Sequence, residues 1–123
     1  MNHVISPAAV ASTLMDYWSP HIVAEVDDCY VKVAKVKGSL TWHRHEAEDE
    51  LFLVLKGTLR IEMEDRTVTL NSGELFVVPK GVRHNPVADQ DCHILLFERK
   101  STAHTGDVMT DRTRSIAEQL GSS

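Results

Sequence analysis

Residues 38–57 read GSLTWHRHEAEDELFLVLKG, and most of what the chain reveals about its fold starts from this stretch. A single residue separates His43 from His45, and Glu50 follows five residues further on. Because side chains alternate between the two faces of a β-strand, the two histidines would point the same way, about 7 Å apart. Imidazole nitrogens together with a carboxylate oxygen suit a divalent transition metal. The stretch therefore predicts part of a metal site in a β-rich protein.

A second informative block lies further along the chain, where residues 73–88 read GELFVVPKGVRHNPVA. A β-rich run leads into the turn residues Pro79-Lys80-Gly81, and His84 follows this turn. We group His84 with the residues of the first block. The predicted metal site then has three histidines and one glutamate inside a small β-barrel: His43, His45, Glu50 and His84.

The first block resembles the first signature motif of the cupin superfamily. The chain has Gly38-x4-His43-x-His45-x4-Glu50-x6-Gly57, where the usual pattern is Gly-x5-His-x-His-x3,4-Glu-x6-Gly. The spacer after the first glycine is therefore one residue short. This departure changes the turn ahead of the first histidine and leaves every ligand of the motif in place.

The second block resembles the second cupin motif in the same way. The chain has Gly73-x5-Pro79-x-Gly81-x2-His84-x3-Ala88, where the usual pattern is Gly-x5-Pro-x-Gly-x2-His-x3-Asn. Alanine thus replaces the final asparagine, although the histidine ligand is present. The resemblance covers roughly residues 38–100.

The resemblance implies an all-β, single-domain cupin β-barrel, also described as a double-stranded β-helix or jelly roll. It implies one divalent transition metal held by the four residues named above, with zinc, iron, manganese, nickel and copper all open. The carboxylate ligand has an alternative, because Glu48 lies in the same acidic loop as Glu50. A cupin resemblance by itself names neither a substrate nor a reaction.

The chain divides into three predicted parts: an N-terminal helical segment (1–21), the β-barrel (22–100) and a C-terminal tail (101–123). Ser6 and Pro7 suit the start of a helix, which we expect over Ala8–Tyr17. Short β-rich runs separated by turn residues favour a sandwich or barrel. The expected strands are 22–26, 30–36, 40–45, 51–55, 58–63, 67–70, 75–78 and 92–98, and a short amphipathic helix is expected over 111–120.

Length and composition exclude several classes of function. The 123 residues suffice for one domain, and the hydrophobic share of 42% is ordinary for a globular protein. A net charge of −5 without a basic stripe opposes nucleic-acid binding. The sequence has no run of 18 apolar residues for a membrane span and no basic, apolar leader, so we expect a cytoplasmic protein.

The alternation along residues 50–55 makes a further prediction. If Glu50 points into the barrel, Phe52 and Val54 should do so too, and the three leucines between and after them should face outward. An outer face with three leucines must be covered by the N-terminal helix, the tail or another subunit. Small cupins similar to this chain often pair through such surfaces, so the resemblance implies a homodimer.

The predicted site supports three functional hypotheses. In the first, the chain is a metal-dependent enzyme, an isomerase, lyase or dioxygenase acting on a small oxygenated molecule such as a sugar, a keto acid or an aromatic compound. In the second, it binds or senses a small carbohydrate or acid and the metal is structural. In the third, the metal only stabilises the barrel. The sequence does not identify a catalytic residue beyond the ligands.

The remaining histidines and the cysteines carry no motif. His3, His21, His93 and His104 lack ligand spacing, and we expect them to be surface or structural residues. The two cysteines, Cys29 and Cys92, fall on separate expected strands and are expected to be reduced, packed thiols.

Overall fold

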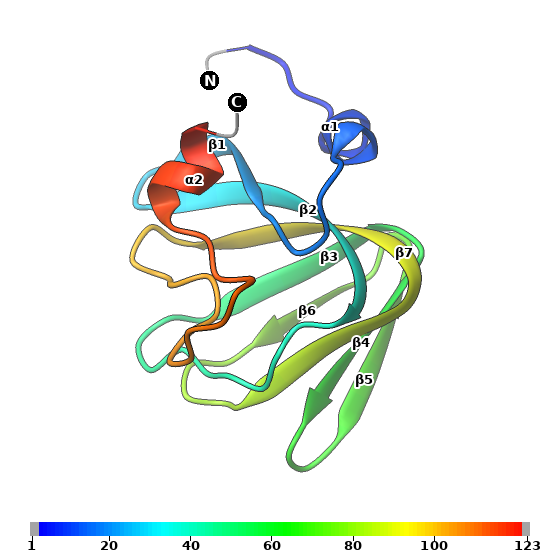
Figure 1. The fold of residues 1–123 in the computed structure, drawn as a ribbon, viewed down its shortest axis with the longest axis vertical. Coiled ribbons are helices and arrows are strands. Elements are labelled where there is room, and N and C mark those ends of the chain that lie inside the picture. Colours follow the sequence, from blue (N-terminus) through cyan, green and yellow to red (C-terminus); the bar gives the residue numbers. More distant parts are fainter. Residues whose placement is uncertain (1–2, 122–123) are drawn as a thin grey trace.

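The structure, a computed structural model, describes residues 3–121, and within them seven antiparallel strands form one curved sheet (Figure 1). The expected all-β barrel with a short N-terminal helix is confirmed. The elements in chain order are α1 (Pro7–Thr13), β1 (His21–Val26), β2 (Cys29–Ser39), β3 (Glu50–Lys56), β4 (Thr58–Met63), β5 (Thr67–Asn71), β6 (Leu75–Val78), β7 (His84–Arg99) and α2 (Ile116–Gly121).

Strand β7 joins the two halves of the barrel, because it pairs with β2, β3 and β4. From Cys92 onward it lies between β2 and β3, whereas its first residues pair with β4 and with the end of β2. The strand bends along its length, as its yellow ribbon shows in Figure 1. One strand therefore carries His84 at one end and Glu98 near the other.

Two strand predictions need correction. The last strand begins at His84 rather than Cys92, because residues 84–91 contain a proline and several polar side chains that hide the strand pattern. The expected strand at 40–45 does not form; β2 ends at Ser39, and His43 makes only an isolated β-bridge with His84.

Both helices are shorter than predicted. Helix α1 starts as expected, with the Ser6 hydroxyl accepting from the Ala9 N–H, but it ends at Thr13 instead of Tyr17. Leu14 already has an extended backbone with a ψ of 138°, and Trp18 then donates its backbone N–H to the carbonyl oxygen of Lys35 in β2. Helix α2 occupies Ile116–Gly121, so it covers only the second half of the expected stretch 111–120 and extends one residue past it. Within residues 3–121, neither helix has the length and apolar character to cross a lipid bilayer.

The alternation predicted for β3 is confirmed. Phe52 and Val54 are buried on the same side as Glu50, inside the main hydrophobic core. On the outer face, Leu55 packs against a small hydrophobic cluster that contains Ala11 of α1. Helix α1 thus covers part of the outer face of the sheet. The N-terminal helix was one of the three possible covers proposed from the sequence.

Gly57, in the turn between β3 and β4, offers a test of how closely β7 approaches this turn. Gly57 has a φ of +93°, and a Cβ added to it would lie 2.9 Å from the carbonyl oxygen of Asp91. Gly73 has a similar φ of +84°, but its added Cβ would meet no atom within 4 Å. We predict that Gly73→Ala lowers the free energy of unfolding by about 1–2 kcal/mol, the cost of a left-handed alanine, and that Gly57→Ala lowers it clearly more. Urea denaturation measures both, and equal losses would contradict the predicted close approach of β7 to this turn.

Candidate metal centre

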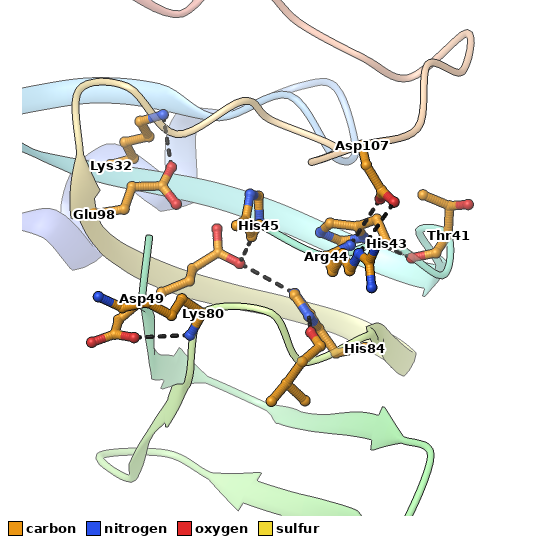
Figure 2. A network of polar contacts seen from close by, with 12 residues as sticks. Lys32, Thr41, His43, Arg44, His45, Asp49, Lys80, His84, Glu98 and Asp107 are labelled. Carbon is orange, nitrogen blue, oxygen red and sulfur yellow. Dashed lines mark hydrogen bonds and ion pairs between the residues drawn. The ribbon is translucent and has the colours of Figure 1, made fainter. Parts of the chain in front are cut away.

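The four predicted ligands come from three segments that meet at one end of the barrel. Glu50 is the first residue of β3 and His84 the first of β7, whereas His43 and His45 lie on the loop between β2 and β3. Two backbone hydrogen bonds join His43 to His84, at 3.0 and 2.8 Å. The Gly81 N–H donates to the carbonyl oxygen of His45 at 2.7 Å. The loop is thus fixed to the turn before β7, and this brings the histidine rings together (Figure 2).

The ligand atoms of the four side chains lie within 4.8 Å of one another, and all four residues are buried. Glu50 Oε1 is 3.4 Å from His45 Nε2 and 3.4 Å from His84 Nε2. None of these three buried atoms has a hydrogen-bond partner among the described residues. Two ligands about 2.1 Å from one ion at a tetrahedral angle lie about 3.4 Å apart. The residues present therefore fit a divalent transition metal.

Backbone carbonyls fix the orientation of two of the rings. His43 Nδ1 lies 2.9 Å from the carbonyl oxygen of Thr41, and His84 Nδ1 lies 2.9 Å from that of Val82. A carbonyl oxygen only accepts, so each Nδ1 carries the hydrogen and each neutral ring keeps its lone pair on Nε2. Burial lowers the pKa of His43 to about 4, which keeps this ring neutral at ordinary pH. The two Nε2 atoms are thus prepared as metal ligands.

A buried ion pair stands behind the glutamate and was not predicted. Glu98 of β7 is the register partner of Glu50, and Lys32 Nζ lies 2.8 Å from Glu98 Oε1 (Figure 2). The Lys32 side chain is 0% exposed. The sequence did hold a signal for it, because Lys32 is in phase with the buried residues Ala34 and Val36 of the same strand.

The pKa values of the two buried carboxyl groups shift in opposite directions. Burial and the charge of neighbouring Glu50 raise the pKa of Glu98 well above its usual range. Burial also opposes ionisation of Glu50, but contacts with Glu98, His45 and His84 hold the pKa of Glu50 well below its usual range. Glu50 is therefore the more readily ionised of the two, as a carboxylate ligand must be.

The acidic residues beside Glu50 have other partners. Glu48 accepts a hydrogen bond from the Ser101 hydroxyl, and Asp49 accepts one from the Lys80 N–H. Both lie outside the four-residue cluster. Between the two carboxylates that the sequence left open, the structure brings Glu50 and not Glu48 to the histidines.

His104 was expected to be a surface or structural residue, but the structure places it at the site. It lines a cavity together with His43 and Glu50. Spacing along the sequence carries no signal for this position, because His104 belongs to the tail. The tail reaches the site through contacts between Asp107 and Arg44, in which each backbone N–H donates to the other residue. His21 and His93 remain outside the cluster.

The fold, the two motifs and the ligand cluster agree with the comparisons with known proteins. The family model described as "Cupin domain" (Cupin_2) matches residues 29–98. The chain therefore belongs to the Cupin_2 family of cupin domains.

Three relatives show how far the likeness extends. A solved cupin-2 domain containing protein from Shewanella frigidimarina is 41% identical, with a TM-score of 0.77 over 79% of this chain and 95% of that one. The uncharacterised protein YdbB of Bacillus subtilis is 35% identical over 77 residues, 62% of this chain and 68% of YdbB. A 3-hydroxyanthranilate 3,4-dioxygenase 2 of Aspergillus clavatus is 31% identical over 88 residues, 68% of this chain but only 46% of that enzyme. The likeness to the dioxygenase thus spans less than half of its length.

The ion pair behind Glu50 can be tested by removing its lysine. Lys32→Met leaves Glu98 buried beside Glu50 without its cation, so we predict that the free energy of unfolding of the metal-free protein falls by about 3–5 kcal/mol. The double variant Lys32→Met/Glu98→Gln should recover much of this loss, because the unpaired carboxylate is gone.

Lys100→Met provides the matched control, because Lys100 pairs with Glu25 at 2.7 Å on the surface, where such pairs contribute little. Urea denaturation of all variants makes the comparison. A Lys32→Met protein as stable as the wild type would contradict the assigned role of the buried pair.

Proposed function

We propose that this cupin is a metal-dependent enzyme that acts on a small oxygenated molecule, with oxidation by dioxygen as its first candidate reaction. One observation carries the proposal: three buried ligand atoms, His45 Nε2, Glu50 Oε1 and His84 Nε2, converge without hydrogen-bond partners beside a cavity. Buried polar atoms without partners are rare in native proteins and call for an ion or ligand. The 31% identity to a dioxygenase supports the choice of reaction.

His43, His45, Glu50 and His84 would hold the metal, and each contributes one atom. When bound, a redox-active metal such as iron would supply electron transfer to dioxygen, and it would also polarise the oxygens of the substrate. The carbonyls of Thr41 and Val82 keep two rings aimed at this point. The barrel core, with Phe52 beside His84, excludes water from the inner side of the site.

A second candidate function is a non-catalytic barrel that binds or senses a small molecule and uses the metal for structure. It is favoured by the tail, which carries His104 into the cavity wall and so limits access to the site. Binding without turnover distinguishes this function from the first.

The metal itself is tested first. We predict that protein purified without added metal carries about one divalent transition metal per chain, by elemental analysis. The variant His43→Ala/His45→Ala should lose it, because two of the four ligands are gone. The matched control His21→Ala/His93→Ala, which removes two histidines outside the cluster, should keep it.

The carboxylate ligand is tested in the same measurement. Glu50→Gln should weaken metal binding by about tenfold or more, whereas Glu48→Gln should leave it unchanged. Wild-type protein that holds no metal, even after reconstitution with iron, manganese and zinc in turn, would overturn the proposal.

Turnover is tested with oxygen. We predict that the iron-loaded protein consumes dioxygen in the presence of catechol, hydroquinone or 3-hydroxyanthranilate, with loss of the aromatic absorbance as the ring opens. An oxygen electrode and a spectrophotometer follow the two signals together. The His43→Ala/His45→Ala variant with the same added iron controls for oxidation by free metal. Tight binding of such a ring without oxygen consumption would instead support the binding barrel.

We also propose that the chain forms a homodimer in the cytoplasm. The outer face beside β3 ends at β6, an edge strand of the sheet, where Leu75 is 56% and Val77 41% exposed. A second copy could cover these side chains and the open edge.

The two free cysteines fit a reducing compartment. Cys29 lies opposite Arg99 and Cys92 opposite Val36, so the two cysteines are roughly 23 Å apart along β2.

A further inference from the structure

Two of the four ligands, His43 and His45, lie on the loop of residues 40–49 and not on a strand. Backbone hydrogen bonds hold this loop against the start of β7 and the turn before it. The tail that follows β7 contacts the same loop, as Figure 2 shows for Asp107. The loop is therefore held by two separate parts of the chain.

The tail contacts the loop at its start, its middle and its end. These three hydrogen bonds join Arg112 to Ser39 at 2.9 Å, Asp107 to Arg44 at 3.0 Å and Ser101 to Glu48 at 2.9 Å. The middle bond is the one that reaches the residue between the two histidines. It is therefore the contact with the most direct effect on the ligands.

Asp107 binds both backbone polar groups of Arg44. The Arg44 N–H donates to Asp107 Oδ1 at 3.0 Å, and the Asp107 N–H donates to the carbonyl oxygen of Arg44 at 3.1 Å. The ion pair between the two side chains is longer, at 3.8 Å, and both are more than 40% exposed, so their charges contribute little. The two backbone bonds thus fix the chain on which His43 and His45 stand.

Gly106 brings the tail into direct contact with the same peptide. A Cβ added to Gly106 would overlap the carbonyl oxygen of Arg44 and would lie 3.0 Å from Cδ2 of His43. The backbone of the tail therefore packs against both the loop and the ring of a ligand. No side chain fits between them.

The part of the tail that makes these contacts is itself well held. Thr102 and Thr105 are each 1% exposed, and the hydroxyl groups of Thr105 and Thr113 lie 2.6 Å apart. The Arg114 N–H donates to His104 Nδ1 at 2.9 Å. Because these bonds fold the tail onto itself, Asp107 presents its two bonds from a structured segment.

We propose that Asp107 and Gly106 are positioning residues of the metal centre. By holding the backbone of Arg44, they keep His43 and His45 directed at the other two ligands and so slow the release of the metal. The other two ligands belong to strands, so an opening of the site starts with this loop. The inference rests on the proposed function and adds to it two residues of the tail.

The test measures how fast the metal leaves. Protein loaded with zinc, or with manganese or iron if it takes up one of these instead, is mixed with an excess of a coloured chelator. We expect Asp107→Ala to release the metal about tenfold faster than the wild type, because a contact that orients two ligands is lost. The Asp107 side chain is 43% exposed, so its loss should change the melting temperature little.

Two further variants separate the hydrogen bond from the charge and from general effects. Asp107→Asn keeps an oxygen that accepts from the Arg44 N–H, and its release rate should stay within about threefold of the wild type. Glu74→Ala is the matched control, because it removes a carboxylate that accepts from a backbone N–H, that of Asn71, at 2.8 Å outside the loop and the tail. It should release the metal at the wild-type rate.

Gly106→Ala tests the close packing without removing a hydrogen-bonding group. The added methyl group separates the tail from the loop, so we expect release at least as fast as in Asp107→Ala. Gly73→Ala carries the same change at a site where the added Cβ meets no atom within 4 Å. It should release the metal at the wild-type rate.

Hydrogen exchange of the metal-free protein gives a second signal that needs no bound ion. The amide of Arg44 should exchange about tenfold faster in Asp107→Ala, because its acceptor is gone, and little faster in Asp107→Asn or Glu74→Ala. NMR spectra of each variant follow this amide and show that the fold is kept.

The outcomes separate the two proposals. A wild-type protein that binds neither zinc, manganese nor iron overturns the proposed function and, with it, this inference. Normal metal content overturns this inference alone if Asp107→Ala releases the metal as slowly as the wild type, if Asp107→Asn is as fast as Asp107→Ala, or if exchange at Arg44 is unchanged.

Discussion

The buried carboxylate of Glu50 is the constraint on which the rest of the site depends. It is 4% exposed, and its Oε1 faces the Nε2 atoms of His45 and His84 at 3.4 Å without a hydrogen bond. His84 Nδ1 lies 2.9 Å from the carbonyl oxygen of Val82, so the Nδ1 hydrogen points away from Glu50 and the Nε2 of the neutral ring faces the carboxylate with its lone pair. This arrangement is costly unless a cation relieves it. Lys32 does not, because it is paired with Glu98.

The topology of the barrel brings the four ligand residues together. Glu50, the first residue of β3, pairs with Val78 at the end of β6, and the short turn after Val78 leads to His84, the first residue of β7. The β-bridge between His43 and His84 then adds the loop that follows β2. Because β7 pairs with three strands, a shift of the ligand at its start is resisted by most of the sheet. The sheet thus sets the positions of Glu50 and His84, and the hydrogen bonds of the loop to His84 and Gly81 set those of His43 and His45.

The sequence predicted the parts of the site that depend on local spacing. His43, His45, Glu50 and His84 were grouped from their spacing, and the alternation along β3 fixed which side chains face inward. The strand expected at 40–45 was wrong because a histidine pair in a loop has the same spacing as one on a strand. His104 was missed because long-range contacts, between residues about sixty positions apart, set the path of the tail.

The tail has a consequence for how the site is completed. Asp107 exchanges hydrogen bonds with Arg44, the residue between the two histidines, and Gly106 lies against the same backbone. A growing chain leaves the ribosome from its N-terminus, so the loop with His43 and His45 emerges long before its partners in β7 and the tail. Until β7 begins to form, the loop lacks the hydrogen bonds to Gly81 and His84 that fix it, and until the tail is made it also lacks those to Asp107. The complete site, with its loop held by both β7 and the tail, can accordingly form only after translation has passed residue 107.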